Sequence, residues 1–489
     1  MEKKTKNAAA GARKFGFLDK LSYAAGDFGC NMSFALKGTV NTFWLVYMGL
    51  DSALFSALLL AVQIWDGIND PIIGALIDRD TRQYRIGKFK AYILTGAFGL
   101  LVSGALCFIP VPNAPTLVKS IIFVVGYIIW DAFYTVANVP YGSMLSLISS
   151  DSGERAQLSA WRGIGSAVGN ALPMIILPFL IWRNVYDENG NPLINAETGK
   201  PVQELLGERL FYIALIMGVI GFLSFLFMLK NSVIRSSDGG RVDSGSGRTS
   251  VFGSILNFFG NRAAMGATIA AMGMFLGTNA SSTATAIMFS IYFGRGELSG
   301  IAGMAGVIPL FILVPFVKGA VLKWGKKECA AIGSFISLIG GAVMLVFPIV
   351  PREYAMAVYI FALFICGMGS GIYQSVSWAL MSDAIDLGEW KYGVREEGMV
   401  YSLHSFFRKF AQGLGPAAVI LIMGFLGYDS KIPVGAQSYQ TALNMCRLVA
   451  SLWFISALFM FVGTAFVYNL NKKMLGKIHE ELRERHSRE

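Results

Sequence analysis

The sequence contains few charged residues, few cysteines and few histidines. Only 15% of its 489 residues are Asp, Glu, Lys or Arg, whereas soluble domains carry about 25%. The 5 cysteines are scattered, and they form no CxxC or Cys/His spacing typical of a metal or redox site. The sequence also has no P-loop, no nucleophile–base pair and no soluble catalytic domain. We therefore expect no enzymatic activity, no resident cofactor and no direct use of ATP.

Apolar residues are abundant instead, at 54% of the chain. They fall in long blocks separated by short charged connections, and each block is long enough to cross a bilayer, which takes roughly 20 residues. The pattern predicts an all-α polytopic membrane protein with twelve transmembrane helices. The predicted spans are 21–49, 52–77, 91–111, 119–149, 157–182, 209–229, 263–293, 298–320, 328–350, 354–385, 397–427 and 441–469.

The predicted spans form two halves of six helices. A basic loop at 87–90 follows the second span, and a similar one at 325–327 follows the eighth. Such duplication is typical of rocking-bundle transporters, whose solute site lies between the halves near the midplane. The predicted organisation is an N-terminal tail at 1–20, a first half at 21–229, a linker at 230–262, a second half at 263–470 and a C-terminal tail at 471–489.

The net charge of +10 is distributed unevenly along the chain. Most lysines and arginines lie in alternate connections and in both termini, which follows the positive-inside rule and argues against a nucleic-acid partner. Both termini are therefore expected in the cytoplasm of a bacterial cell with the helices in its inner membrane. Residues 1–20 lack an apolar core and predict a tail, not a signal peptide. The residues of the tail at 471–489 predict a solvated or membrane-surface helix.

Two aspartates one turn apart interrupt the second predicted span. Asp66 and Asp70 share one helix face, and Asn69 adds a carbonyl oxygen beside them. A carboxylate at the bilayer centre costs about 2.5–3.5 kcal/mol, so intramembrane acids are usually functional. Carboxylate, amide and hydroxyl oxygens suit a hard cation. We expect a site for Na⁺ or H⁺ at Asp66, Asp70, Asn69 and Thr135, while the alternative is a structural ion pair.

Further polar and aromatic residues in the spans indicate a hydrophilic interior, because no other place can solvate them. Arg162 presents a planar fork that suits sugar hydroxyls or a carboxylate, or else pairs with Asp66 or Asp70. Lys409 is expected in the cavity and Arg408 toward a loop. Lys37 either snorkels or neutralises an acidic substrate, and the roles of Asp27 and Asp131 stay open. The predicted substrate-binding residues are Asn31, Tyr134, Asn138, Arg162, Tyr373, Trp378 and Lys409.

Several motifs together resemble the glycoside–pentoside–hexuronide:cation symporter family. They are WDGINDPIIG at 65–74, RIGKFK at 85–90, NVPYGS at 138–143, DLGE at 386–389 and REEG at 395–398. The resemblance implies a major facilitator fold with twelve transmembrane helices. It also implies that Asp66 and Asp70 are cation-site acids, with Asn69 and Thr135 beside them. It also implies that Arg162 binds sugar and that Lys409 is coupled to the cation site.

Two departures from the melibiose carrier, a member of that family, bear on the substrate. That carrier has acids where this chain has Asn31 and Asn138, and a tryptophan where this chain has Gly142. The missing acids make the interior more welcoming to an anion. The pattern is more similar to the glucuronide and xyloside carriers of the family, so we expect a glucuronide or a related β-glycoside.

Three functions therefore remain. The first is cation-coupled symport of a glycoside by a carrier that works as a monomer, with membrane lipid and a small sugar as its partners. The second is a cation-coupled exporter of other small molecules, which the polar interior disfavours. The third is a sensor that binds sugar without moving it, which the lack of a signalling domain disfavours. The sequence fixes neither the sugar, the coupling ion nor the stoichiometry.

Overall fold

The computed structural model describes residues 13–80, 82–149, 152–235, 251–393 and 396–488. Packing divides the chain into two units. The first contains residues 1–183 and 204–242, and the second contains residues 184–203 and 243–489. The loop at 184–203 thus packs with the second unit, where Asn195 Nδ2 donates to the Gly435 carbonyl at 2.7 Å and Gln203 Nε2 to Glu297 Oε2 at 2.8 Å.

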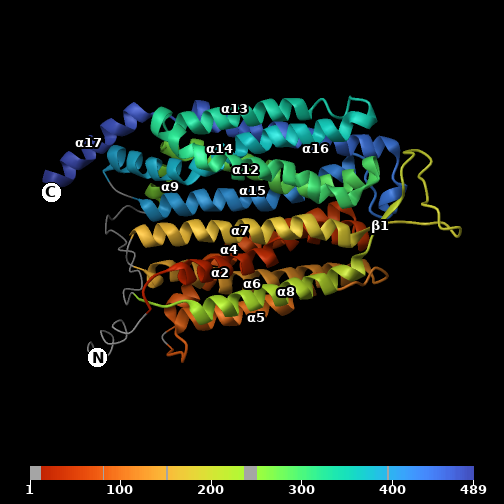
Figure 1. Ribbon diagram of the computed structural model, residues 1–489, viewed down its shortest axis with the longest axis horizontal. Helices are drawn as coiled ribbons and strands as arrows, with labels where there is room; N and C mark the ends of the chain where they lie inside the picture. The colour runs from red at the N-terminus through yellow and green to blue at the C-terminus, as the bar shows by residue number, and fades with distance from the viewer. Residues whose placement is uncertain (1–12, 81, 150–151, 236–250, 394–395, 489) are drawn as a thin grey trace. The chain divides into compact units, whose positions relative to one another are not determined.

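The first unit is a bundle of long helices that run side by side (Figure 1). Helix α2 packs against α7 and α8, α5 packs against α6 and α8, and α4 packs against α6. Two short strands, β1 and β2, pair where the chain passes between the units. The bounds are α2 Phe17–Phe34, α3 Leu36–Thr42, η1 Phe43–Tyr47, α4 Ser52–Arg79, α5 Lys88–Leu106, α6 Thr116–Ile148, α7 Ser152–Ile181, β1 Trp182–Asn184, β2 Gln203–Leu205 and α8 Gly207–Asn231.

The second unit is also a helical bundle. Helix α14 packs against α12 and α13, and α10 packs against α14, α15 and α16. The bounds are α9 Val251–Gly260, α10 Arg262–Phe275, η2 Leu276–Ala280, α11 Ser281–Met288, η3 Phe289–Phe293, η4 Gly296–Leu298, α12 Ser299–Trp324, α13 Lys326–Met344, α14 Arg352–Tyr392, α15 Glu397–Phe425, η5 Val434–Ala436, α16 Tyr439–Phe461, η6 Val462–Val467 and α17 Lys472–Arg488.

The described residues form helices at all twelve predicted spans. Ten helices are long and apolar enough to span a bilayer. The other two crossings, 17–47 and 262–293, are runs of shorter helical segments that include π-helical stretches. These two runs are the first crossings of the first and the second half. The predicted all-α fold with six spans in each half is therefore confirmed, and the first span of each half is not one regular helix.

Local sequence explains where several of these helices begin and end. The Asp51 carboxylate accepts from the backbone N–H groups of Ala53 and Leu54 at 3.0 and 3.1 Å and so caps α4. Asn261 and Ser438 cap α10 and α16 in the same way. Helix α14 ends at Gly393, whose φ of 70° is a left-handed conformation that favours glycine.

Glycines allow close helix packing inside each unit. A Cβ atom at Gly165 of α7 would collide with the backbone of Ala24 in α2, and one at Gly367 of α14 would collide with Gly306 in α12. Small residues at helix contacts are typical of membrane bundles, because tight packing replaces the hydrophobic drive that lipid cannot supply.

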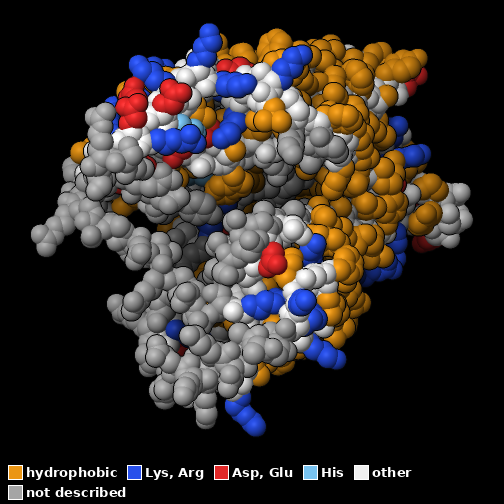
Figure 2. Space-filling model, turned by 60° about the vertical axis from the view of Figure 1, so that its left-hand side comes forward, with side chains coloured by type: hydrophobic (Ala, Val, Ile, Leu, Met, Phe, Trp, Pro, Cys, Tyr) orange, Lys and Arg blue, Asp and Glu red, His pale blue; other side chains and the backbone are white. Residues whose placement is uncertain are grey.

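The outer surface of both units is strongly apolar. Large hydrophobic side chains such as Phe98, Phe311 and Phe425 are more than half exposed. Figure 2 shows one face on which hydrophobic side chains cover a broad area while charged side chains gather toward one end. With the ten long apolar helices, this surface identifies a multi-pass membrane protein.

The linker between the halves and the C-terminal tail differ from the sequence interpretation. The predicted linker at 230–262 includes residues 251–260, which form helix α9 and bury Phe258 in the core of the second unit. Residues 236–250 lie outside the described residues. The C-terminal tail forms the expected helix, α17, but Ile478 and Leu482 are buried in the same core, so the helix packs on the unit and is not simply solvated.

Candidate functional site

The predicted cation residues lie where α4 and α6 pack together in the first unit. Asn69 of α4 donates its amide N–H groups to Asp131 Oδ2 and to Thr135 Oγ1, each at 3.1 Å. Asn69, Asp131 and Thr135 are only 1–2% exposed. Because Asp131 and Thr135 are four residues apart on α6, one amide can reach both. The structure therefore brings together two of the predicted cation residues, Asn69 and Thr135, and places a further acid, Asp131, beside them.

Asp66 lies three residues before Asn69 on α4, and its nearest charge comes from another helix. Lys37 Nζ of α3 lies 3.3 Å from Asp66 Oδ2. Four aromatic rings surround the same ammonium, with centroids 5.3–6.0 Å away. The predicted alternative of an ion pair with a neighbouring helix thus holds for Asp66, and Lys37 reaches into the unit interior, not out to the interface. Asp70 follows on α4, but its side chain lies outside the described part of the structure.

Arg162 of α7 pairs with Asp27 of α2. Its Nε donates to Asp27 Oδ1 at 3.0 Å, and its guanidinium lies 5.0 Å from the centroid of the Tyr141 ring. The Tyr141 hydroxyl in turn donates to the Tyr23 carbonyl at 2.7 Å. The Asp27 side chain is 8% exposed, whereas that of Arg162 is 37% exposed. Part of the Arg162 side chain is therefore exposed although its Nε is bonded to Asp27, which the sequence could not decide.

Amide side chains extend this network along α2 and α7. Asn31 Nδ2 donates to the Asp27 carbonyl at 2.7 Å, and Asn31 Oδ1 accepts from Asn170 Nδ2 at 2.5 Å. Asn138 of α6 accepts a weak bond from the Cys30 thiol at 3.8 Å. The sequence interpretation missed Asn170, although its place eight residues after Arg162 on one helix face could have revealed it.

The other predicted substrate residues lie in the second unit or beside Lys37. Tyr134 is one of the four rings around the Lys37 ammonium. Tyr373 is 1% exposed and its hydroxyl donates to the Ala267 carbonyl at 3.2 Å, so it packs in the core here. Trp378 is 43% exposed and lies 4.8 Å from the Arg408 guanidinium. Lys409 is half-buried on α15. The Arg408 guanidinium therefore lies against an aromatic ring of its own unit.

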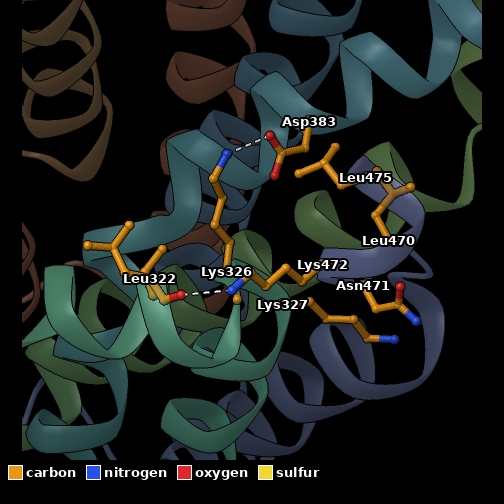
Figure 3. Close-up of a pocket in the computed structure, with 10 residues that line it drawn as sticks. Leu322, Lys326, Lys327, Asp383, Leu470, Asn471, Lys472 and Leu475 are labelled. Carbon is orange, nitrogen blue, oxygen red and sulfur yellow. Dashed lines mark hydrogen bonds and ion pairs between the residues drawn. The ribbon is translucent and has the colours of Figure 1, made fainter. Parts of the chain in front are cut away.

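A cavity of about 260 Å³ lies at one end of the second unit, away from the predicted residues. Figure 3 shows Lys326 reaching Asp383 and Lys472 reaching the Leu322 carbonyl, at 2.6 and 2.8 Å. The other labelled residues around it are Lys327, Leu470, Asn471 and Leu475. The cavity lies between the turn before α13 and helix α17. Because Lys326 and Lys472 already have hydrogen-bond partners, we assign the cavity no ligand. Among the residues that the structure describes, no cluster of three or more His, Cys, Asp or Glu could hold a metal ion.

Comparison with known proteins gives one consistent family. Residues 22–472 match the family described as MFS/sugar transport protein. An uncharacterised symporter of Bacillus subtilis (strain 168) is 28% identical over 483 residues, which cover 97% of this chain and 96% of that protein. A glucuronide carrier protein homolog of Escherichia coli (strain K12) is 26% identical and covers 83% of each chain.

A solved structure supports the fold. The crystal structure of a D-xylose-proton symporter superposes with a TM-score of 0.59 and 15% sequence identity, covering 91% of this chain and 96% of that chain. At this identity the likeness concerns the fold alone, and that fold is the major facilitator fold implied by the family resemblance.

Proposed function

Because the chain belongs to the MFS/sugar transport protein family, we propose that it is a secondary active symporter. It imports a glycoside together with Na⁺ or H⁺ across the bacterial inner membrane, with both termini in the cytoplasm. The proposed substrate is a glucuronide or a related β-glycoside or xyloside.

The observation that carries the cation coupling is the buried polar cluster between α3, α4 and α6. Asp66, Asp131, Asn69 and Thr135 provide carboxylate, amide and hydroxyl oxygens in the interior of an apolar bundle. These are the ligands that a hard monovalent cation or a proton requires. A single structural ion pair with Lys37 would need only one of the two acids.

The anionic substrate is supported by the second network of the first unit. The partly exposed Arg162 guanidinium can hold a glucuronide carboxylate by paired hydrogen bonds. Asn31 and Asn138 lie nearby as neutral amides, so they bind hydroxyl groups without repelling a carboxylate. The glucuronide carrier homolog among the relatives agrees with this choice.

Transport follows from binding both ligands before the halves change access. A membrane potential of 100 mV contributes about 2.3 kcal/mol for each net positive charge moved inward, so an uncharged glycoside carried with one cation can accumulate roughly 50-fold from the potential alone. A glucuronide anion carried with one cation moves no net charge, so the concentration gradient of the cation drives its accumulation. Coupling requires that the carrier bind sugar poorly without its cation. Negative charge at Asp66 and Asp131 would disfavour an anionic sugar until a cation arrives.

Uptake into right-side-out vesicles tests this proposal. Labelled glucuronides, xylosides and galactosides are offered with a sodium gradient, a proton gradient or neither. We expect accumulation of glucuronides or β-glycosides under one of the two gradients. Equal uptake with and without both gradients would contradict symport, and accumulation of galactosides alone would contradict the substrate assignment.

A further inference from the structure

Lys37 is held deep in the first unit by an enclosure of aromatic rings. Its ammonium lies 5.3 Å from the centroid of Phe34, and 5.7, 5.8 and 6.0 Å from those of Tyr127, Trp130 and Tyr134. The last three rings share one face of α6, because their spacing follows the helical repeat. Aromatic faces attract a cation that has lost its water, so this enclosure suits a positive charge.

Neighbouring hydrogen bonds fix the rings in place. The indole N–H of Trp130 donates to Ser33 Oγ at 2.6 Å, and the Tyr127 hydroxyl accepts from Gln63 Nε2 at 2.7 Å. Trp130 and Tyr127 are therefore each held by a hydrogen bond to a residue other than the lysine. The side chain of Lys37 is 24% exposed and that of Asp66 is 16% exposed, which leaves a path for a small ion to reach the pair.

Asp131 supplies an acceptor that the surroundings leave unsatisfied. Its Oδ2 accepts from Asn69, but its Oδ1 is buried and has no hydrogen-bond partner within the described part of the chain. Asp131 also interacts electrostatically with both Lys37 and Asp66, and its carboxyl lies within hydrogen-bonding reach of the Asp66 carboxyl, where two ionised acids have no proton to share. With all three groups ionised, one negative charge remains uncompensated. A buried anionic oxygen without a partner is unfavourable, and one monovalent cation would remove both problems.

We propose that Lys37 is a resident counter-ion of the cation site and that Asp131 is a further cation ligand. In the carrier without a bound cation, the Lys37 ammonium pairs with the Asp66 carboxylate. The incoming cation competes with Lys37 for that carboxylate and also binds Asp131 Oδ1. The inference rests on the proposed cation coupling. It adds a residue pair, Lys37 and Asp131, that sets how tightly cations bind and how many bind.

Two opposite effects on cation affinity follow. The variant Lys37→Gln removes the competitor and keeps most of the side-chain length, so the cation should bind about tenfold more tightly or better, within the roughly 5- to 150-fold range of coupled sites. Asp131→Asn removes a ligand and should weaken binding by a similar factor. The double variant has the charge of the original cluster and should return near the original affinity.

The test is Na⁺ binding to the purified full chain, together with the cation concentration that half-saturates uptake in vesicles. The matched control is Lys119→Gln, which removes a lysine of the same unit whose ammonium donates to the Met48 carbonyl at 2.6 Å. We expect the control to leave the half-saturating concentration unchanged. Lys37→Arg keeps the charge and should keep the original affinity, which separates competition from packing.

The outcomes distinguish this inference from the proposed function. Gradient-driven uptake whose half-saturation is unchanged in Lys37→Gln and in Asp131→Asn would overturn the inference and leave symport intact. Uptake without cation dependence in the original chain, but with it in Lys37→Gln, would support a resident counter-ion and overturn symport by the original chain. If neither the original chain nor Lys37→Gln binds a cation or depends on one for uptake, both the inference and the proposed symport are overturned. If Lys37→Gln does not fold, Asp131→Asn alone still decides, because unchanged affinity there contradicts a ligand role.

Discussion

Neutralising the pair formed by Arg162 and Asp27 separates the two roles that the sequence allows for the arginine. The variant Arg162→Gln leaves the buried Asp27 carboxylate without its ionic partner. The double variant with Asp27→Asn removes both charges. If Arg162 also binds the substrate carboxylate, the double variant should regain stability but not uptake.

The size of the stability effect follows from the geometry. At 3.0 Å and an effective dielectric constant of about 20, the attraction is roughly 5 kcal/mol before desolvation. Removing one partner of a fully buried pair costs about 3–5 kcal/mol, and an exposed pair contributes about 0–1 kcal/mol. Since Asp27 is buried and Arg162 is one-third exposed, we expect a loss of about 2 kcal/mol for Arg162→Gln. The double variant should recover most of it.

Thermal stability of the purified variants and initial uptake of a labelled glucuronide measure the two effects. We expect uptake to fall at least about 30-fold in both variants, which is the equivalent of about 2 kcal/mol. Normal uptake by the double variant would refute a substrate role for Arg162 and leave it as a counter-ion of Asp27. Unchanged stability of Arg162→Gln would refute the analysis of the pair.

Three more predictions concern α4 and the turn after it. Asp66→Asn should abolish gradient-driven accumulation while sugar exchange persists, and normal uphill uptake in vesicles would contradict its role in the cation site. Asn69→Ala removes the amide that joins Asp131 to Thr135, so the half-saturating cation concentration should rise about tenfold; an unchanged value would contradict it. The Tyr84 and Tyr92 hydroxyls donate to Asp80 at 2.5 and 2.6 Å and lower the pKa of that carboxyl to about 2. The stabilisation that the ionised Asp80 carboxylate gives the folded protein is therefore complete above about pH 4 and is lost as the pH falls toward 2. In acid-unfolding experiments, Tyr84→Phe should make the loss of stability between pH 4 and pH 2 smaller.

Spacing along a single helix could be used from the sequence. The 3.6-residue repeat predicted that Asp66 and Asp70 share one helix face with Asn69 beside them, and in the structure Asp66 and Asn69 both reach polar partners on other helices. The length and polarity of the apolar blocks were enough for the twelve crossings and the two halves. These signals are local, so they survive without knowledge of how the helices pack.

Partners on other helices could not be predicted. Lys37 and Asp66 are 29 residues apart, and Arg162 and Asp27 are 135 residues apart. In a soluble protein the apolar stripe of a helix shows which face is buried, but here the lipid-facing side is apolar too. The rotation of each helix about its axis is therefore weakly encoded. Tyr373 shows the same limit, because a backbone carbonyl can satisfy a tyrosine hydroxyl as well as a sugar can.

Helix α6 connects the two polar networks of the first unit. Asp131, Tyr134 and Thr135 face the Lys37 cluster, and within two further turns Asn138 contacts Cys30 and Tyr141 lies against Arg162. The first crossing does the same, since α2 carries Asp27 and α3 carries Lys37. A cation that changes the charge balance at Asp131 therefore acts on a rigid element that also lines the arginine network. Coupling is reciprocal, so a sugar held at Arg162 must strengthen cation binding as much as the cation strengthens sugar binding. We infer that this coupling between the two binding sites is built into the first unit, through helix α6 and the first crossing, which each carry residues of both networks.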